Sequence, residues 1–297
     1  MFSGSMVAIV TPMSADGSLD LAAWDRLLDF HRAEGTDGIV VGGTTGESPA
    51  LRAEELAHLT RRAVERCAGK LKVIVGTGTN ATDSSVARTR RFSRLGVDGV
   101  MLVTPYYSKP PQEGLYRHFL AAADASAVPV ILYNVPGRSA VDLLPATVAR
   151  LATHPRIVAL KEAVASVARA HELVETCPRN FAVLSGDDAT AIDLIAAGAR
   201  GVISVTGNVA PRRLREAVAA ALAGDMTRAQ SIDATLQPLH AQLFVEASPI
   251  PVKWALARLG LIGNTLRLPL VGLASVHEET VLRAMRAAGI ELEVRAA

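Results

Sequence analysis

Lys161 stands at the end of an apolar run, where a charged side chain is costly to bury. Residues 156–163 read RIVALKEA, and positions 157–160 predict a buried strand. A solvated lysine has a pKa of about 10.4, so only about one in a few thousand is neutral at pH 7. Apolar surroundings lower that pKa and release a nucleophilic amine suited to Schiff-base chemistry. The alternative is a lysine that pairs with Glu162 or extends to solvent.

The other four lysines are weaker candidates for this chemistry. Lys70 and Lys72 precede a predicted strand, so we expect them at the opposite end of the fold. Lys253 belongs to the C-terminal helical region. Lys109 follows PYYS in a loop that could reach the site, but nothing apolar encloses it.

Imine chemistry also needs groups that carry protons. Tyr133, Tyr107 and the hydroxyl of Thr44 follow predicted strands and could form such a relay. Tyr133 could instead fill space, and Thr44 could cap a helix. Arg138, in YNVPGRSA, suits bidentate binding of a carboxylate, with a surface salt bridge as the alternative.

The segment GGTTGES at 42–48 is rich in glycine but lacks the GK[ST] of a phosphate-binding P-loop. It predicts a tight turn, or a set of backbone N–H groups suited to a small carboxylate or phosphate.

Metal ligands are scarce among the residues that follow the predicted strands. None of the seven histidines does so, and we interpret all of them as surface positions on helices or loops. Asp187 and Asp188 could bind a hard cation, but an N-cap on the next helix is the simpler interpretation. We therefore predict neither a metal nor a cofactor.

Eight short apolar runs alternate with helical patterns, which is typical of strands buried on both faces of a parallel sheet. The runs are 6–12, 38–43, 72–76, 99–105, 129–134, 156–162, 181–186 and 201–207. The helical patterns are 20–34, 53–68, 82–95, 113–125, 142–153, 164–176, 188–198 and 211–223.

This rhythm predicts a (β/α)8 TIM barrel, whose chemistry lies at the carboxyl ends of the strands. A doubly wound sheet is the alternative, but its usual GxGxxG after the first strand is missing. From about residue 225 only helices are predicted, at 225–244, 250–260 and 276–289. We therefore expect a barrel domain at 1–224 and a small helical domain at 225–297.

The composition argues against several partners. The net charge is +2 with no strongly basic half, so neither nucleic acid nor an anionic membrane is favoured. Cys67 and Cys177 show no metal or disulfide spacing, which suits a reducing compartment. The N-terminus predicts a strand rather than a signal peptide, and we expect a soluble, cytoplasmic protein.

Several long segments resemble the dihydrodipicolinate synthase / N-acetylneuraminate lyase family of pyruvate-dependent class I aldolases. They are GIVVGGTTGES, VTPYY, YNVPGRS, VALKEA, LSGDDA, GVISVTGN and PIPVKWAL. The resemblance extends from the N-terminus to LRLPL at 266–270, nearly the whole chain. It implies the lyase chemistry of lysine and diaminopimelate biosynthesis, in which pyruvate condenses with L-aspartate 4-semialdehyde to 4-hydroxy-tetrahydrodipicolinate.

The resemblance also implies roles for individual residues. Lys161 would form an imine with pyruvate, while Thr44, Tyr133 and Tyr107 would relay protons. Tyr107 would come from a neighbouring subunit of a homotetramer built as a dimer of dimers.

Four positions are implied to bind substrate. Thr45 and Gly186 would seat pyruvate, and Arg138 would bind the carboxylate of the semialdehyde. Ile203 is the fourth implied substrate-binding position.

A lysine-feedback site is implied at Ser48, Asn80 and Tyr106. Three other positions of that site depart from the lysine-sensitive pattern, since Ala53 and Leu56 replace histidines and Ser84 replaces a glutamate. Without that acidic group lysine loses a partner for its α-ammonium, so we expect weak or absent feedback inhibition.

Other functions stay open at this point. Within the family, a 2-keto-3-deoxy acid aldolase or a sialic acid lyase is the alternative, and Arg138 favours the synthase reaction over both. A non-catalytic metabolite sensor is a further alternative, but it would not need Lys161, Tyr133 and Thr44 together.

Overall fold

The strands form one closed parallel barrel in sequence order. The computed structural model describes residues 2–291. The strands are β1 (Gly4–Ala8), β2 (Gly38–Val41), β3 (Lys72–Gly76), β4 (Gly99–Val103), β5 (Val130–Asn134), β6 (Ile157–Glu162), β7 (Ala182–Ser185) and β8 (Gly201–Ser204). β1 pairs with both β2 and β8, which closes the barrel and confirms the predicted fold.

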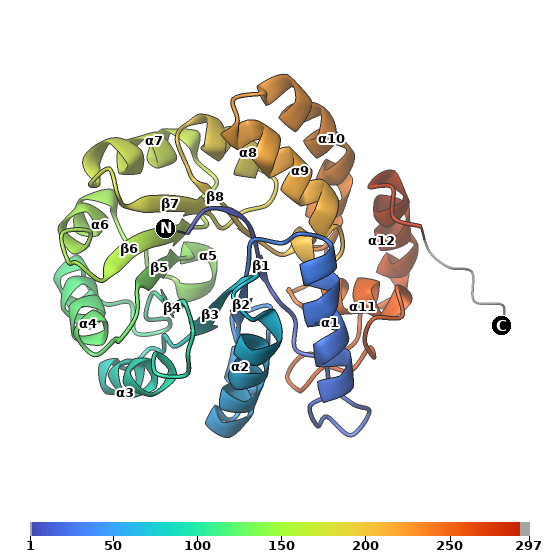
Figure 1. Ribbon diagram of the computed structural model, residues 1–297, viewed down its shortest axis with the longest axis horizontal. Helices are drawn as coiled ribbons and strands as arrows, with labels where there is room; N and C mark the ends of the chain where they lie inside the picture. Colours follow the sequence, from blue (N-terminus) through green and yellow to red (C-terminus); the bar gives the residue numbers. More distant parts are fainter. Residues whose placement is uncertain (1, 292–297) are drawn as a thin grey trace.

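Helices surround the barrel, and the longer ones lie within about three residues of the predicted positions (Figure 1). Around the barrel lie α1 (Leu21–Ala33), α2 (Ala53–Cys67), α3 (Thr82–Phe92), α4 (Gln112–Asp124), α5 (Pro136–Ser139), α6 (Pro145–Leu151), α7 (Val167–Thr176), α8 (Ala191–Ala196) and α9 (Pro211–Leu222). Then follow α10 (Met226–Gln242), α11 (Ile250–Arg258) and α12 (Ser275–Ala287).

The main errors of prediction lie at the carboxyl ends of strands. The first, second, fourth and eighth strands end two to four residues before the predicted positions. The short helices η1 (Ser48–Ala50) and η2 (Thr206–Asn208), which follow the second and eighth strands, were not predicted, and neither was α5 after the fifth strand. An apolar residue in the loop after a strand is buried for packing, so periodicity alone extends the strand into it.

Two hydrophobic layers hold the barrel together. The inner layer fills the barrel with side chains from its strands, including Met6, Ile131 and Ile203. The outer layer joins the outward faces of the strands to the surrounding helices, and it includes residues of α10, α11 and α12. This packed interior leaves the ends of the barrel as the places for a site.

The helices after the barrel pack against its last units. α10 lies against α8 and α9, and α12 lies against α10 and α11 (Figure 1). The division between a barrel domain at 1–224 and a helical domain at 225–297 stays a prediction, and its last six residues lie outside the described part. Within residues 2–291, no helix combines the length and the apolar character needed to cross a membrane.

Candidate active site

Lys161 lies near the carboxyl end of β6, beside Tyr133 of β5 and Leu184 of β7. Its side chain is buried, with only 4% exposed. Burial lowers the pKa of Lys161 to about 8, which the charge of Asp188 opposes and the charge of Arg138 assists. An amine with this pKa is neutral in roughly a tenth of molecules at pH 7. Burial and a lowered pKa are what a nucleophilic amine needs, and the catalytic role of Lys161 stays a prediction.

Glu162 does not pair with Lys161, because consecutive residues of a strand point to opposite faces. Its carboxylate accepts a hydrogen bond from Arg169 Nε at 2.9 Å and from Asn134 Nδ2 at 3.1 Å. Arg169 also binds Asp142 at 2.8 Å. The alternative of a Lys161–Glu162 ion pair is therefore wrong.

Tyr133 lies against the lysine. Lys161 Nζ is 4.4 Å from the centroid of the Tyr133 ring. Burial raises the pKa of Tyr133 to about 12, while the charge of Arg138 and a hydrogen bond with Thr44 oppose that rise. The phenol thus keeps its proton at neutral pH, and the Thr44 hydroxyl is its partner. Tyr133 therefore lies between the Lys161 amine, which faces its ring, and the Thr44 hydroxyl.

Three of the predicted substrate-binding positions lie deep at this end of the barrel. A Cβ at Gly186 would come within 3.0 Å of Lys161 Cε, so only glycine leaves the lysine its space. Ile203 is fully buried in the inner layer of the barrel. Thr45, in the turn after β2, is 3% exposed.

A cavity of about 350 Å³ opens over this end of the barrel, lined by Thr44, Arg138, Ser48 and Tyr106 among others. Arg138 is exposed on α5, and no ion pair joins it to another residue in the part of the chain that the structure describes. An unpaired guanidinium beside a buried amine makes this cavity suited to an anionic substrate. The surface salt bridge that was the alternative for Arg138 does not form.

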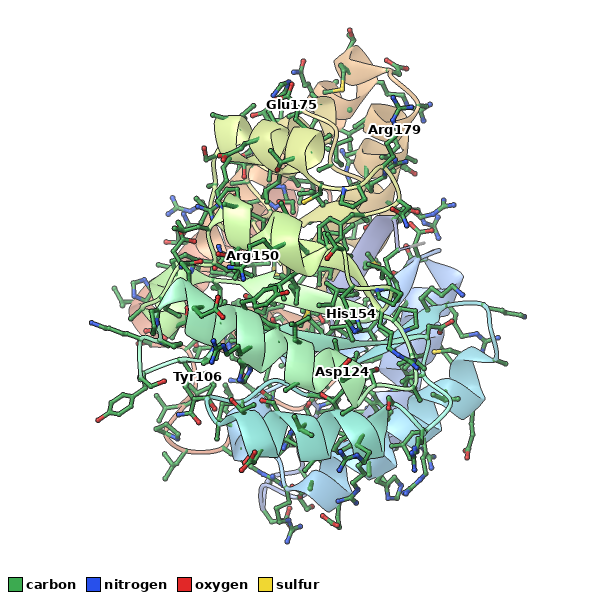
Figure 2. All side chains as sticks on the ribbon, turned by 90° about the vertical axis from the view of Figure 1, so that its left-hand side faces the viewer. Tyr106, Asp124, Arg150, His154, Glu175 and Arg179 are labelled. Carbon is green, nitrogen blue, oxygen red and sulfur yellow. The ribbon has the colours of Figure 1, made fainter. Side chains whose placement is uncertain are left out.

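Figure 2 labels residues from both ends of the barrel strands. Tyr106, which follows β4, lies at the left edge, at the carboxyl ends of the strands. His154, Asp124 and Arg179 lie before the amino ends of strands, toward the right. Tyr106, which lines the cavity, therefore lies at the end of the strands opposite to these three residues.

Tyr107 extends away from the chain that carries it. It is 89% exposed and has a φ of +76°, a left-handed conformation that is rare outside glycine. The structure does not bring it to Lys161 within one chain. Its role in the relay stays a prediction.

Three of the seven histidines contradict the prediction that all lie at the surface. His31, His118 and His240 are buried on the inner faces of α1, α4 and α10. Each has a threonine hydroxyl within 3.0 Å of Nδ1, which gives one ring nitrogen of the buried side chain a hydrogen-bond partner. In residues 2–291, no three His, Cys, Asp or Glu side chains are grouped to hold a metal ion.

The two aspartates after β7 have separate partners. Asp187 Oδ2 accepts a hydrogen bond from the backbone N–H of Thr190, the residue before α8, at 3.0 Å. Asp188 instead accepts from the backbone of Val205 and Thr206, at 2.9 and 3.1 Å. The prediction of an N-cap is therefore wrong for both: Thr190 is the N-cap of α8, Asp187 fixes the turn before it, and Asp188 fixes the chain after β8.

Comparison with known proteins decides the family. The model of the dihydrodipicolinate synthetase family matches residues 1–288. The chain belongs to this family. The 4-hydroxy-tetrahydrodipicolinate synthases of Methylococcus capsulatus and Nitrosomonas europaea are both 53% identical over 290 residues, which cover 98% of this chain and 100% and 99% of theirs.

Solved structures of the dihydrodipicolinate synthetase family have the same fold. The chloride-inhibited dihydrodipicolinate synthase of Acinetobacter baumannii, complexed with pyruvate, is 44% identical with a TM-score of 0.96. The enzyme of Aquifex aeolicus is 43% identical with a TM-score of 0.95. Both alignments cover 98% of this chain and 100% of the other.

Only two of the three predicted lysine-feedback positions line the cavity. Ser48 and Tyr106 line the cavity, whereas Asn80 is exposed. Leu56 is fully buried, and a Cβ at Gly42 would come within 2.4 Å of its Cδ1. Leu56 therefore packs in the core and offers no polar contact to a ligand.

Sequence reasoning missed a second buried lysine next to the active-site turn. Lys253 of α11 is fully buried, and its Nζ donates to Glu47 Oε1 at 2.6 Å and to the carbonyl of Thr11 at 2.9 Å. The signal was its place inside the apolar run PIPVKWAL, since an unpaired lysine is rarely buried. The partner could not be found, because Glu47 is 206 residues away.

Proposed function

We propose that this chain condenses pyruvate with L-aspartate 4-semialdehyde to 4-hydroxy-tetrahydrodipicolinate, through an imine between Lys161 and pyruvate. The observation that carries this proposal is the buried Lys161 amine, whose pKa is lowered to about 8 beside Tyr133. The relatives named as this synthase and the related structure that holds pyruvate support the choice of substrates.

The first half of the reaction forms the nucleophile. Neutral Lys161 Nζ attacks the C2 carbonyl of pyruvate, and loss of water from the carbinolamine leaves the imine. Loss of a proton from the methyl carbon then gives the enamine. Tyr133 gives and takes these protons through its contact with Thr44, and Tyr107 of a neighbouring subunit connects the relay to solvent.

The second half joins the substrates and releases the enzyme. The enamine carbon attacks the aldehyde carbon of the semialdehyde, whose oxygen takes a proton from the relay. The amine of the semialdehyde then attacks the imine carbon, which closes the ring and expels the Lys161 amine. No redox step occurs, so the reaction needs no oxidant or reductant.

The two substrates have separate binding groups. Thr45, Gly186 and Ile203 enclose pyruvate around Lys161, where burial is deepest. Arg138 binds the carboxylate of the semialdehyde from the exposed side of the cavity. This guanidinium favours the synthase reaction over cleavage of a polyhydroxylated sugar acid, whose hydroxyls would call for neutral hydrogen-bonding groups.

The assembly follows from the same proposal. A homotetramer built as a dimer of dimers would let Tyr107, which is exposed on its own chain, complete the site of its neighbour.

An aldehyde panel tests the proposal. With pyruvate fixed, turnover with L-aspartate 4-semialdehyde is expected to exceed turnover with neutral aldehydes and sugar aldehydes. Arg138→Ala should raise the KM for the semialdehyde by about 10- to 100-fold, with little effect on the KM for pyruvate. A sugar aldehyde as the best substrate would contradict the synthase reaction.

A further inference from the structure

The turn that carries Thr44 and Thr45 has a strained centre at Glu47. Glu47 has a φ of +55°, a left-handed conformation that costs a non-glycine residue about 1 kcal/mol or more. Its N–H donates to the carbonyl of Thr44 at 3.0 Å. The conformation of Glu47 therefore fixes the backbone of Thr44 directly.

The Glu47 side chain is held by residues that follow the barrel in sequence. The carboxylate is 2% exposed. Lys253 Nζ donates to its Oε1 at 2.6 Å, and the backbone N–H of Arg267 donates to its Oε2 at 3.0 Å. Lys253 Nζ also donates to the carbonyl of Thr11, at 2.9 Å.

Arg267 fixes the segment that leaves the turn. Its guanidinium binds both oxygens of Glu55, at 2.7 and 2.8 Å, and the carbonyl of Ala50 at 2.8 Å. Glu55 in turn accepts from the backbone N–H of Arg52, at 2.9 Å. The chain from Glu47 to Glu55 is thus fixed at both ends.

A buried ion pair contributes little net stability compared with apolar residues of similar volume, since desolvation offsets most of its attraction. The charge and the hydrogen bonds instead fix the position of the side chains that they join. Two donors, Lys253 Nζ and the backbone N–H of Arg267, hold the two oxygens of the Glu47 carboxylate in one position, and with it the Thr44 backbone.

We propose that Glu47 and Lys253 are positioning residues, which hold Thr44 against Tyr133 and Thr45 against pyruvate. The region after the barrel thereby takes part in the proton relay without touching substrate. This inference rests on the proposed function, because it assigns Thr44 and Thr45 their roles.

The test removes the pair without leaving a buried charge. In Glu47→Gln/Lys253→Met we expect kcat to fall about 10- to 100-fold and the KM for pyruvate to rise about tenfold, because the turn is released. The KM for the semialdehyde should not change, since Arg138 lies on α5 and not in the turn that Glu47 holds. Lys161 should still be labelled when pyruvate and borohydride are added.

A matched control removes another ion pair of the barrel. Lys72 and Asp98 pair at 2.8 Å at the amino ends of strands, far in the fold from the catalytic end. Lys72→Met/Asp98→Asn should therefore leave kcat and both KM values unchanged. A change of the same size in this control would mean that any lost ion pair has the effect.

A milder variant guards against a folding defect. Glu47→Gln alone keeps the size of the side chain and an oxygen for Lys253, and it should shift kcat and the pyruvate KM in the same direction by about three- to tenfold. Wild-type constants in either folded variant would overturn the inference. If the wild-type enzyme itself is not labelled by pyruvate, the proposed function fails instead.

Discussion

Two buried lysines separate the catalytic role of an amine from its structural role. Lys161 and Lys253 are 4% and 0% exposed, and burial lowers the pKa of both. Lys253 has Glu47 and a carbonyl as partners, which favour its charged form. In the described residues no hydrogen bond or ion pair holds Lys161 Nζ, which faces the Tyr133 ring instead.

Burial therefore does not by itself make a lysine a nucleophile. The carboxylate beside Lys253 opposes the effect of burial on its pKa and accepts a hydrogen bond from its amine. The absence of such a partner lets Lys161 lose its proton near neutral pH. The predictions below test this difference, from the largest expected effect to the smallest.

Replacing Lys161 removes the nucleophile alone. Lys161→Met should lower kcat by about 10⁴-fold or more, because no other group can form the imine. The free energy of unfolding should stay the same or rise, since a buried amine without a partner is replaced by an apolar chain. Steady-state kinetics and urea unfolding check both parts, and a large loss of stability would contradict the comparison.

Tyr133→Phe tests whether a buried amine suffices without a proton carrier. The ring stays beside Lys161, but the phenol proton is lost, so kcat should fall about 10²- to 10⁴-fold. Pyruvate should still label Lys161, more slowly than in the wild type. A wild-type kcat would show that Tyr133 only fills space.

Lys253→Met should lower stability, whereas Lys161→Met should not. It leaves the Glu47 carboxylate buried without its cation, which should cost about 3–5 kcal/mol of the free energy of unfolding. Urea unfolding measures this loss. Addition of Glu47→Gln should restore most of it, and two losses that simply add would contradict the pairing.

The pH dependence of kcat/KM and of stability should reflect the pKa of Lys161. Because its pKa is lowered to about 8, kcat/KM for pyruvate should rise about tenfold per pH unit up to that value and then level off. Stability should rise between about pH 8 and pH 10.4, since only the unfolded state still binds the proton there. A rate that keeps rising to pH 10 would mean an ordinary lysine.

Lysine added as an effector should have the smallest effect. With Leu56 in the core and Ser84 in place of an acidic residue, millimolar lysine should leave the rate nearly unchanged. Strong inhibition would overturn this expectation. Ser84→Glu, which returns the acidic group, should increase any inhibition.

The barrel and Lys161 could be predicted because their signals are local. Apolar runs at a regular spacing predict parallel strands, and Lys161 at the end of one such run places the amine at the carboxyl end of its strand. Glu47 and Lys253 could not be paired, since they are distant in sequence and meet only when the last helices pack. The role of Tyr107 could not be settled from a single chain either, because its exposure on one subunit does not show which residues it contacts in a neighbouring subunit.

Trapping with pyruvate and borohydride, followed by peptide mass analysis, tests the central claim most directly. Reduction of the imine should add the mass of a reduced pyruvate to the peptide that contains Lys161. The peptide with Lys253 should stay unlabelled, and Lys161→Met should take up none. Labelling at Lys253, or none in the wild-type enzyme, would contradict the account.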